Sequence, residues 1–405
     1  MAGERYVTAQ AAAAELGISM ATLYAYTSRG QLRSEPVPDR PRERRYYRED
    51  IERLRERKEA RRDPAKAAAR GLHWGSPVLD SAITLIDSGK LYYRGLDALM
   101  LTQGVSLEAV AELLWAAEPI QQGRSLEQPC ALSAARIARL RACAKGAPLS
   151  LLQAALPVAA ASDPASYDLR PAAVRQTGAR ILRLFTTLVT GRDSPPPMHR
   201  ALQAAWAPRK PMAAEVIRAA LVLCADHELN VSAFVARCAA SAGASPYDVV
   251  SAAMATLKGQ RHGGATERAG LLFQEAGTPG RARAAMASLL RRGESVPGFG
   301  HPLYSSGDPR AALLLKLAEA SGNREESRLI RQLARAGAEL LQEQPNLDFG
   351  LAAISRAYGL PEHAPLLLFA LGRTVGWIAH AIEQYATGEL IRPRARYTGP
   401  LPAAG

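Results

Sequence analysis

Apolar residues recur at intervals of three and four along most of this chain, and no other sequence feature limits its fold so strongly. The spacing is plain in SLEAVAELLWAAEP, in PCALSAARIARLRACAKG and in AAEVIRAALVLCADHELNVSAFVARCAASAG. Residues three and four apart lie on one face of an α-helix, so each stretch predicts a helix with one buried face. The 405 residues, 48% of them apolar, suffice for two or three domains with a sizeable core. We predict a mainly α-helical globular protein.

The rest of the composition argues against other classes of protein. The four cysteines lie far apart without a CxxC spacing, which argues against a zinc ribbon or a redox motif and fits a reducing cytosol. The N-terminus lacks the uninterrupted apolar region of a secretory signal. The apolar run 366–382 contains Arg373, whose charge would be costly at mid-membrane depth. We therefore predict a cytoplasmic protein without a membrane partner.

Positive charge is concentrated at the front of the chain. The whole sequence has a formal net charge of +13, and its first 70 residues hold 16 basic and 11 acidic residues. Phosphate groups attract such a basic segment, and a weaker positive balance attracts small anions. The charge therefore permits a nucleic-acid partner for the head and an anionic substrate for the body.

The first sixty residues predict two short helices joined by a tight turn. Thr8 can cap AQAAAAEL, which Gly17 would end, and Ser19 can cap MATLYAYTSRG, which ends at Gly30. Two helices joined in this way suggest a helix-turn-helix. The basic, proline-broken segment PVPDRPRERRYY could form a wing, and residues 49–62 predict a highly charged helix.

This head resembles the DNA-binding heads of the MerR and excisionase type through ELGIS, TLYAYTSRGQL and RRYYREDIERL. The resemblance implies a winged helix-turn-helix domain over residues 1–62, with DNA bound through residues 5–60. Its second helix would enter a major groove and its wing would contact phosphates. The alternative is a helical hairpin that makes dimer contacts.

A linker and a small hairpin lie between the head and the helices of the body. Residues 63–75 contain Pro64 and several alanines and lose the apolar periodicity, which is typical of a linker. After it, alternating apolar residues flank DSGK in SAITLIDSGKLYYRG, which predicts a small β-hairpin.

Three histidines lie in sequence contexts that are unusual for packing residues. His262 lies among glycines in KGQRHGGA, His301 follows a glycine in GFGHPLY, and His227 follows an acidic residue in ADHELNV. Glycine allows the backbone to approach a ligand closely. A zinc site is disfavoured because no HExxH or clustered His/Cys spacing is present, so we predict no metal. Each histidine taken alone could equally be a hydrogen-bonded structural residue.

Six motifs together carry a second resemblance. ADHELNVSAF, KGQRHGGA, GFGHPLYSSGDPRA, PNLDFG, GRTVGWIAHAIEQ and RPRARYTGP are similar to the ordered motifs of the citrate synthase family, over roughly residues 76–400. The resemblance implies the two-domain helical fold of that family, placed after the head and linker. The large domain would comprise 76–263 and 361–405, and the small mobile domain 264–360.

The resemblance also implies a reaction, the condensation of acetyl-CoA with oxaloacetate to citrate and CoA. Acyl-CoA would be a co-substrate, with no permanently bound cofactor. Asp348 would be the base that deprotonates the thioester methyl group, and His262 would donate a hydrogen bond to the thioester oxygen. His301 would polarise the ketone of oxaloacetate.

Substrate binding is implied in the same way. Arg310, Arg373 and Arg392 would bind the carboxylates of oxaloacetate, because arginine offers fixed charge with fork geometry, and His227 would add a further contact. Arg392 would come from the partner subunit of a homodimer with a shared active site. Asp308 is expected to order its loop. The adenine end of CoA would lie against the backbone of Val296, Pro297, Gly298, Phe299 and Gly300.

Several functions stay open at this point. Propionyl-CoA differs from acetyl-CoA by one methylene, so a 2-methylcitrate synthase is an alternative, as is an enzyme that cleaves citryl-CoA. Pro302 and Leu303 replace the basic residue and valine that many bacterial members carry after the histidine. A third alternative is a regulator whose head binds DNA while its body senses oxaloacetate or an acyl-CoA.

Overall fold

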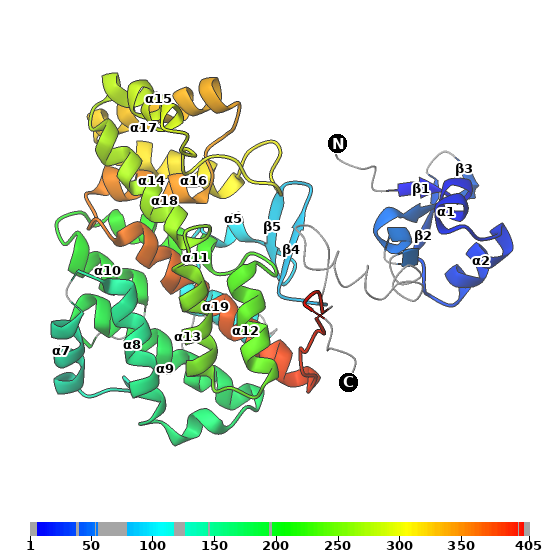
Figure 1. Cartoon of the computed structure of the whole chain (residues 1–405), viewed down its shortest axis with the longest axis horizontal. Helices are drawn as coiled ribbons and strands as arrows, with labels where there is room; N and C mark the ends of the chain where they lie inside the picture. Colours follow the sequence, from blue (N-terminus) through cyan, green and yellow to red (C-terminus); the bar gives the residue numbers. More distant parts are fainter. Residues whose placement is uncertain are drawn as a thin grey trace. The chain divides into compact units, whose positions relative to one another are not determined.

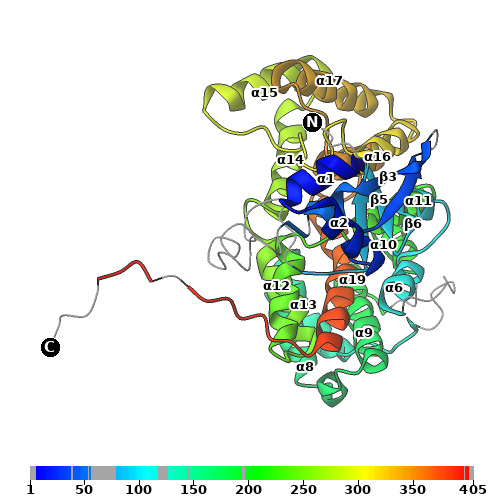
Figure 2. The same cartoon turned by 90° about the vertical axis from the view of Figure 1, so that its right-hand side faces the viewer.

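The chain divides into two compact units, each with its own hydrophobic core. Unit 1 comprises Met1–Asp80 and Arg392–Gly405, and unit 2 comprises Ser81–Ile391. The computed structural model describes residues 6–37, 40–52, 54–55, 79–116, 126–144, 146–193, 197–395 and 397–400. The predicted linker at 63–75 lies outside these residues. Figures 1 and 2 give two views of the chain.

Unit 1 begins with two short helices whose ends agree with the sequence. Its elements are β1 Tyr6–Thr8, α1 Ala9–Leu16, α2 Met20–Ser28, β2 Ser34–Val37 and β3 Arg40–Tyr47. The Thr8 hydroxyl accepts the N–H of Ala11 at 3.2 Å, and Gly17 ends α1 in the left-handed region. The Ser19 hydroxyl caps α2 by accepting the N–H of Thr22. The predicted caps and turn of the two helices are confirmed.

The strands of unit 1 form one antiparallel sheet in the order β1-β3-β2. The predicted wing is therefore a hairpin of β2 and β3. Leu23, Tyr46 and Ile51 are fully buried between the helices and the sheet. Residues 48–52 and 54–55 are helical, and the rest of the predicted charged helix lies outside the described part of the chain. Whether unit 1 acts as a helix-turn-helix stays a prediction.

Unit 2 is mainly helical, as the apolar spacing predicts. Its helices are α5 Ala98–Leu101, α6 Leu107–Ala116, α7 Ala134–Cys143, α8 Pro148–Ala160, α9 Pro171–Thr190, α10 Met198–Trp206, α11 Ala213–Cys224, α12 Val231–Ser241, α13 Pro246–Leu257, α14 Gly263–Ala276, α15 Ala282–Arg291, α16 Pro309–Glu319, α17 Arg324–Leu341, α18 Leu347–Tyr358 and α19 Ala364–Thr387, with short 3₁₀ helices at Pro164–Tyr167 and Pro279–Arg281.

A small antiparallel sheet precedes these helices. It consists of β4 Thr84–Asp87, β5 Lys90–Tyr93 and β6 Leu96–Asp97 in sequence order. Asp87 pairs with Lys90, and the two residues between them, Ser88 and Gly89, both have positive φ. A two-residue turn of this kind suits the twist of a hairpin. The hairpin predicted around DSGK is confirmed.

The helices of unit 2 gather in two groups around α19. In Figure 1, α14 to α18 lie at one end of the unit, and α7 to α10 with α12 and α13 lie at the other. Both views show α12 and α13 beside α19. The first group corresponds closely to residues 264–360, for which the sequence predicts a small domain. The mobility of that domain stays a prediction.

Helix α19 is the centre of the core. It is long and apolar enough to cross a membrane, but its most apolar 18-residue window is entirely buried inside the protein. Neighbouring helices on several sides cover it, among them α11, α12, α13 and α9. The length and apolar character of α19 are therefore explained by packing within unit 2.

Two glycines allow α19 to approach the C-terminal end of α11 closely. A Cβ atom at Gly372 would lie 2.6 Å from the Leu221 carbonyl oxygen and 2.7 Å from the Cys224 Cβ. At Gly376 it would lie 2.4 Å from the carbonyl oxygen of Ala225. These distances are shorter than any normal contact, so a side chain at either position would push the two helices apart.

We predict that Gly372→Ala lowers the free energy of unfolding by about 1–3 kcal/mol, the usual cost of overpacking a core. Gly270→Ala, in the interior of α14, is the matched control. Its Cβ would meet nothing within 4 Å, so we expect a gain of up to about 1 kcal/mol from better helix propensity. Urea unfolding measures both. Equal midpoints for Gly372→Ala and the wild type would contradict the close approach.

Candidate active site

The turn after α11 carries the first predicted site residue, and the β4–β5 hairpin fixes that turn. The Tyr93 hydroxyl donates to backbone carbonyl oxygens at the end of α11, 3.0 Å from Val222 and 3.1 Å from Asp226. The Thr84 hydroxyl donates to the Asp226 carboxylate at 2.6 Å. These contacts hold the next residue, His227, in a buried position with only 7% of its surface exposed.

His227 and His301 meet around Tyr304. The Nε2 atom of His227 lies 2.9 Å from the Tyr304 hydroxyl, and the two imidazole rings are 5.1 Å apart between centroids. Their residues are far apart in sequence, so the contact joins the end of α11 to the loop before α16. The Arg310 guanidinium lies 5.3 Å from the centre of the Tyr304 ring. Two of the predicted imidazoles and one predicted arginine are therefore brought together.

Both imidazoles are neutral at physiological pH. Burial, and then the positive charge of Arg310, lowers the pKa of His301 to about 4. Burial followed by Arg310 and Arg373 holds the pKa of His227 well below its usual range. The Nδ1 atom of His301 accepts the backbone N–H of Leu303 at 3.2 Å. The single proton of the neutral His301 ring is consequently on Nε2, which is a hydrogen-bond donor.

Arg310 is held by Asp308. The Asp308 carboxylate caps α16 and binds Arg310 through two contacts, 3.0 Å to Nε and 2.8 Å to Nη2. It also accepts the N–H of Leu347 at the start of α18, at 3.0 Å. Burial opposes its ionisation, but Arg310 lowers the pKa of the Asp308 carboxyl. Asp308 thus orders its loop, and of the guanidinium nitrogens Nη1 has no hydrogen-bond partner among the described residues.

Arg373 is more deeply buried and lacks a carboxylate partner. Only 1% of its surface is exposed. Its Nε donates to the carbonyl oxygen of Cys224 at 2.8 Å, and its guanidinium lies 4.9 Å from the centre of the Phe369 ring. No carboxylate of the described residues lies within 4.0 Å of it. Burial lowers its pKa, and the charge of Asp226, which acts at longer range, opposes this only in part. A buried charge without a direct counterion is costly, so this site favours an anion.

His262 lies directly before α14 and is tied to a second polar cluster. Its Nε2 is 2.8 Å from the Ser232 hydroxyl, which also accepts the indole N–H of Trp377 at 3.1 Å and lies 2.7 Å from Oδ1 of Asn230. Burial, and then Arg373, lowers the pKa of His262 to about 4. The Phe369 ring that faces Arg373 is also 5.6 Å from the His262 ring.

Asp348 is in the first turn of α18, where Asn346 caps the helix. The Thr266 hydroxyl donates to its Oδ1 at 2.5 Å. Thr266 is four residues after His262, in the first turn of α14. Burial raises the pKa of Asp348 above the usual value for an aspartate, although the bond from Thr266 opposes this. The result is a carboxylate that is more basic than usual and lies near His262.

The segment Val296–Gly300 is mostly buried, and its backbone is bonded to the residues that precede α18. The N–H of Gly300 donates to the carbonyl oxygen of Gln344, and the N–H of Asn346 donates to that of Gly298, both at 2.9 Å. Gly298 has φ 88, and a Cβ there would lie 3.0 Å from that of Phe349. This backbone therefore positions the cap of α18, and with it Asp348. Its predicted contact with CoA stays a prediction.

The predicted residues fall into three sets. His227, His301 and Arg310 surround Tyr304, His262 and Arg373 flank Phe369, and Asp348 is bonded to the helix that His262 precedes. Arg392 is exposed and belongs to unit 1, so its role in a shared site stays a prediction. Among the residues with coordinates described above, no three His, Cys, Asp or Glu side chains form a metal-binding group.

The sequence reasoning missed Tyr304, Ser232 and Thr266. Thr266 could have been found, because it is one helical turn after His262 and so lies on the same face as that end of the helix. Tyr304 is near His301 in sequence, but its bond to His227 spans 77 residues. Ser232 offers no local signal, since its partners Trp377 and His262 come from other helices.

The pKa values of the site histidines predict how stability depends on pH. The unfolded rings titrate near pH 6.5, whereas folded His262 and His301 titrate near 4. As the pH falls from 6.5 to 4, the unfolded chain binds protons before the folded chain does. The stabilisation linked to these two neutral rings is therefore complete above pH 6.5 and is lost over this range. Asp348, with its raised pKa, acts in the opposite direction. We expect His262→Gln to reduce the loss between pH 7 and 4.5 by about 1–3 kcal/mol.

Urea unfolding at several pH values measures this effect, with His363→Gln at an exposed position as the matched control. The same pH dependence in His262→Gln and the wild type would contradict the burial of a neutral ring at this position.

Comparison with known proteins agrees with the resemblance seen in the sequence motifs. The family model for the C-terminal domain of citrate synthase matches residues 71–394. Citrate synthase 2 of Bacillus subtilis is 38% identical over 194 residues, which are 47% of this chain and 52% of that protein. Citrate synthase of Deinococcus radiodurans is 30% identical over 273 residues, 62% of this chain and 72% of that protein. The chain spans about half the length of the first of these curated relatives.

Solved structures share the fold of unit 2. A ternary complex of carboxymethyl coenzyme A and oxaloacetate with citrate synthase from Thermoplasma acidophilum has a TM-score of 0.70 at 24% identity, covering 83% of this chain and 97% of that one. Citrate synthase from Pyrobaculum aerophilum has a TM-score of 0.69 at 25% identity, covering 83% and 93%. The matched family model, the ordered motifs and this fold agree: the chain belongs to the citrate synthase family.

Proposed function

We propose that the protein is an acyltransferase that condenses acetyl-CoA with oxaloacetate to form citrate and CoA. The observation that carries this proposal is Arg373, a buried guanidinium without a direct carboxylate partner that lies within electrostatic range of His227 and Arg310. Such a site is completed by a small dianion. The Thermoplasma acidophilum relative, solved with oxaloacetate and a CoA analogue, supports this choice of ligands.

Oxaloacetate would be bound by its two carboxylates. Arg373 offers both terminal nitrogens, and Arg310 offers Nη1 while Asp308 holds its other side. Neutral His227 adds a polar contact. Arg392 of the partner subunit would complete the clamp, which makes a homodimer necessary for activity. Charge-assisted bonds of this kind are stronger than neutral ones and fix the orientation of the ketone.

Deprotonation of the thioester methyl group is the difficult step. Asp348 would take the proton, and its burial makes the carboxylate a better base than an exposed aspartate. His262 would donate to the thioester oxygen on which negative charge develops. Removing one such preorganised donor in other enzymes costs about 3–4 kcal/mol. The bond from Thr266 orients Asp348 toward the start of α14.

His262 can donate in this way only as one tautomer. Its Nε2 faces the Ser232 hydroxyl, so a donor directed at substrate must be Nδ1–H, and Ser232 must give its own proton to Nε2. In this structure the Ser232 hydroxyl donates to Oδ1 of Asn230 at 2.7 Å, so its proton would have to turn to Nε2 of His262 when the substrate binds. The indole N–H of Trp377 occupies one lone pair of the Ser232 oxygen, and Oδ1 of Asn230 would keep the N–H groups of Ser232 and Ala233 as donors after that turn.

The carbon–carbon bond would form when the enolate carbon attacks the ketone carbon. The Nε2–H of His301 would donate to the ketone oxygen, which becomes the hydroxyl of citryl-CoA. Water then cleaves the thioester, releasing citrate and the free thiol of CoA.

We also propose that the backbone of 296–300 contacts the adenine end of CoA, that 264–360 closes over the substrates, and that the enzyme is cytoplasmic.

Two acyl donors, acetyl-CoA and propionyl-CoA, are compatible with the same chemistry. A relative in Bacillus subtilis named citrate/2-methylcitrate synthase is 34% identical over 191 residues. One methylene changes binding by only about 1–3 kcal/mol. A 2-methylcitrate synthase that uses propionyl-CoA is therefore the alternative within the same chemistry, and cleavage of citryl-CoA is a further one.

We expect Asp348→Ala and His262→Ala each to lower turnover at least about a hundredfold, the lower end for a positioned acid or base. Release of free thiol from acetyl-CoA with oxaloacetate measures this. Glu339→Ala, at an exposed carboxylate of α17, is the control and should keep wild-type turnover. Asp348→Asn preserves the shape of the side chain and separates loss of charge from loss of fold, which circular dichroism checks.

Unchanged turnover in Asp348→Asn would exclude Asp348 as the base. Propionyl-CoA assayed in parallel decides the acyl preference, and citryl-CoA supplied as substrate tests the cleavage reaction. A wild-type protein without thiol release from either acyl-CoA would contradict the condensing activity.

A second candidate function concerns unit 1. We propose that it binds DNA and that the citrate synthase-like body senses oxaloacetate or an acyl-CoA. Support comes from the paired helices α1 and α2, the hairpin β2–β3 beside them, and the exposed Tyr24 on α2. The basic residues of the hairpin segment would contact phosphates.

Mobility shift with genomic fragments tests this second function across salt concentrations, with and without oxaloacetate and acetyl-CoA. We expect retardation that weakens as salt rises, because phosphate contacts release counterions. Arg44→Gln/Arg45→Gln should weaken it, and the control Arg335→Gln in unit 2 should not. No retardation at low salt would exclude DNA binding.

A further inference from the structure

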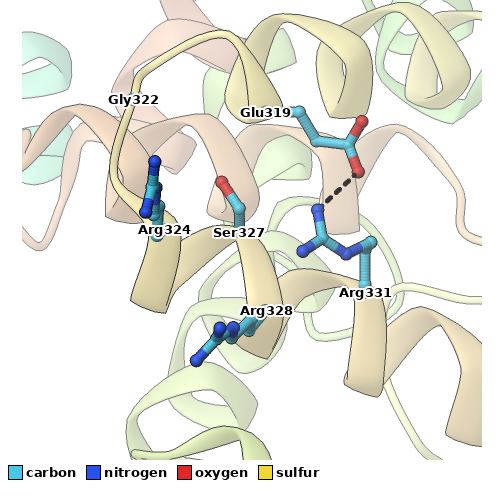
Figure 3. Close-up of a pocket in the computed structure, with 6 residues that line it drawn as sticks. All are labelled: Glu319, Gly322, Arg324, Ser327, Arg328 and Arg331. Carbon is cyan, nitrogen blue, oxygen red and sulfur yellow. Dashed lines mark hydrogen bonds and ion pairs between the residues drawn. The ribbon is translucent and has the colours of Figure 1, made fainter.

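We propose that a pocket between the end of α16 and the start of α17 binds the phosphate group of a small phosphorylated ligand. The pocket has a volume of about 530 Å³, within the range of small-molecule sites. It is lined by Glu319, Gly322, Arg324, Ser327, Arg328 and Arg331. Figure 3 shows these side chains around the turn that connects the two helices.

The backbone at this turn favours an anion. Gly322 has φ 76, so the chain reverses sharply before α17. Asn323 caps the helix by accepting the N–H of Glu326. The N–H groups of Arg324 and Glu325, in the first turn of this 18-residue helix, have no carbonyl partner one turn earlier in it. Their partial positive charge adds to that of the arginines.

Three arginines supply the main attraction. Arg324, Arg328 and Arg331 follow at intervals of four and three residues, which puts them on one face of α17. Arg324 and Arg328 make no ion pair with any described residue. Arg331 lies 3.3 Å from Glu319, but both side chains are about half exposed, at 56% and 46%. An exposed pair of this kind contributes at most about 1 kcal/mol, so a phosphate can replace the glutamate.

Ser327 is the observation that points most directly to a ligand. Its residue is only 6% exposed, it lines the pocket, and its hydroxyl has no hydrogen-bond partner among the described residues. Two buried hydroxyls in other helices of unit 2 behave differently: Ser355 in α18 and Thr374 in α19 donate to the carbonyl oxygen four residues earlier, each at 2.8 Å. The Ser327 residue is thus nine-tenths buried, and its hydroxyl has access to the pocket, where it can donate to a ligand.

The chemistry of the site selects phosphate. The lining holds three positive side chains and one negative one, and the neighbouring Glu326 is already paired with Arg356 at 2.7 Å. A phosphate offers several strong acceptor oxygens and up to two charges, which match two guanidinium forks, a hydroxyl and a helix start. Two sources share this chemistry: a free phosphorylated metabolite, and the phosphates of an acyl-CoA.

Isothermal titration calorimetry of the full chain with inorganic pyrophosphate tests the proposal. We expect Arg324→Gln/Arg328→Gln to bind pyrophosphate at least about tenfold more weakly than the wild type. Arg335→Gln is the control: it removes one positive charge from the same helix, and its side chain is 73% exposed and lies outside the pocket. It should stay within about twofold of the wild type. Ser327→Ala should weaken binding at least about threefold.

Repeating the titration with saturating CoA separates the two sources. Pyrophosphate affinity that CoA leaves unchanged assigns the pocket to a free phosphorylated ligand. Competition by CoA, together with weaker CoA binding in Arg324→Gln/Arg328→Gln, assigns it to the phosphates of CoA. No binding by the wild type, equal binding by the double variant, or an equal loss in Arg335→Gln would overturn the proposal.

Discussion

The close approach of α19 to the end of α11 is the constraint on which the site depends. Because Gly372 and Gly376 lack side chains, the backbones meet at distances that no other residue would allow. Arg373, between the two glycines, then reaches the carbonyl oxygen of Cys224. One turn further along α19, Trp377 reaches Ser232 and through it His262. A single helix contact therefore fixes both the guanidinium of Arg373 and the polar cluster that holds His262.

The two buried arginines of the proposed site, Arg310 and Arg373, are stabilised in different ways. Arg310 carries its own counterion, since Asp308 binds it through two contacts and raises its pKa. Arg373 contacts a carbonyl oxygen and an aromatic ring, and Asp226 acts on it only at longer range, so that burial lowers its pKa. Burying one unpaired ion costs several kcal/mol. An anion bound beside Arg373 would offset part of this cost.

Sequence patterns predicted those features of the structure that depend on residues close together in the chain. The caps Thr8 and Ser19, the hairpin turn at Ser88 and the helical body follow from residues within a few positions of one another. The pairing of Asp308 with Arg310 is equally local. The bonds from Tyr304 to His227 and from Ser232 to His262 are not, because they join segments whose contact depends on the packing of entire helices. Side chains that position the predicted histidines therefore stayed invisible in the sequence.

Three helix starts converge on the proposed site. His262 precedes α14, Asp308 and Arg310 begin α16, and the first turn of α18 carries Asp348. Thr266 joins the first turn of α14 to that of α18, and Asp308 joins the start of α16 to Leu347. Helix starts carry partial positive charge, which stabilises anions by about 0.3–1 kcal/mol each when exposed and more when buried.

This convergence suits a substrate with two carboxylates, but it opposes a basic aspartate, because positive charge lowers a carboxyl pKa. Burial nevertheless dominates at Asp348, whose pKa is raised despite Thr266 and Arg310. The two effects have different ranges: the positive field extends across the site, whereas loss of water acts on the one carboxylate that is enclosed. The same group of residues can therefore carry a positive field that attracts an anion and a carboxylate that is more basic than an exposed aspartate.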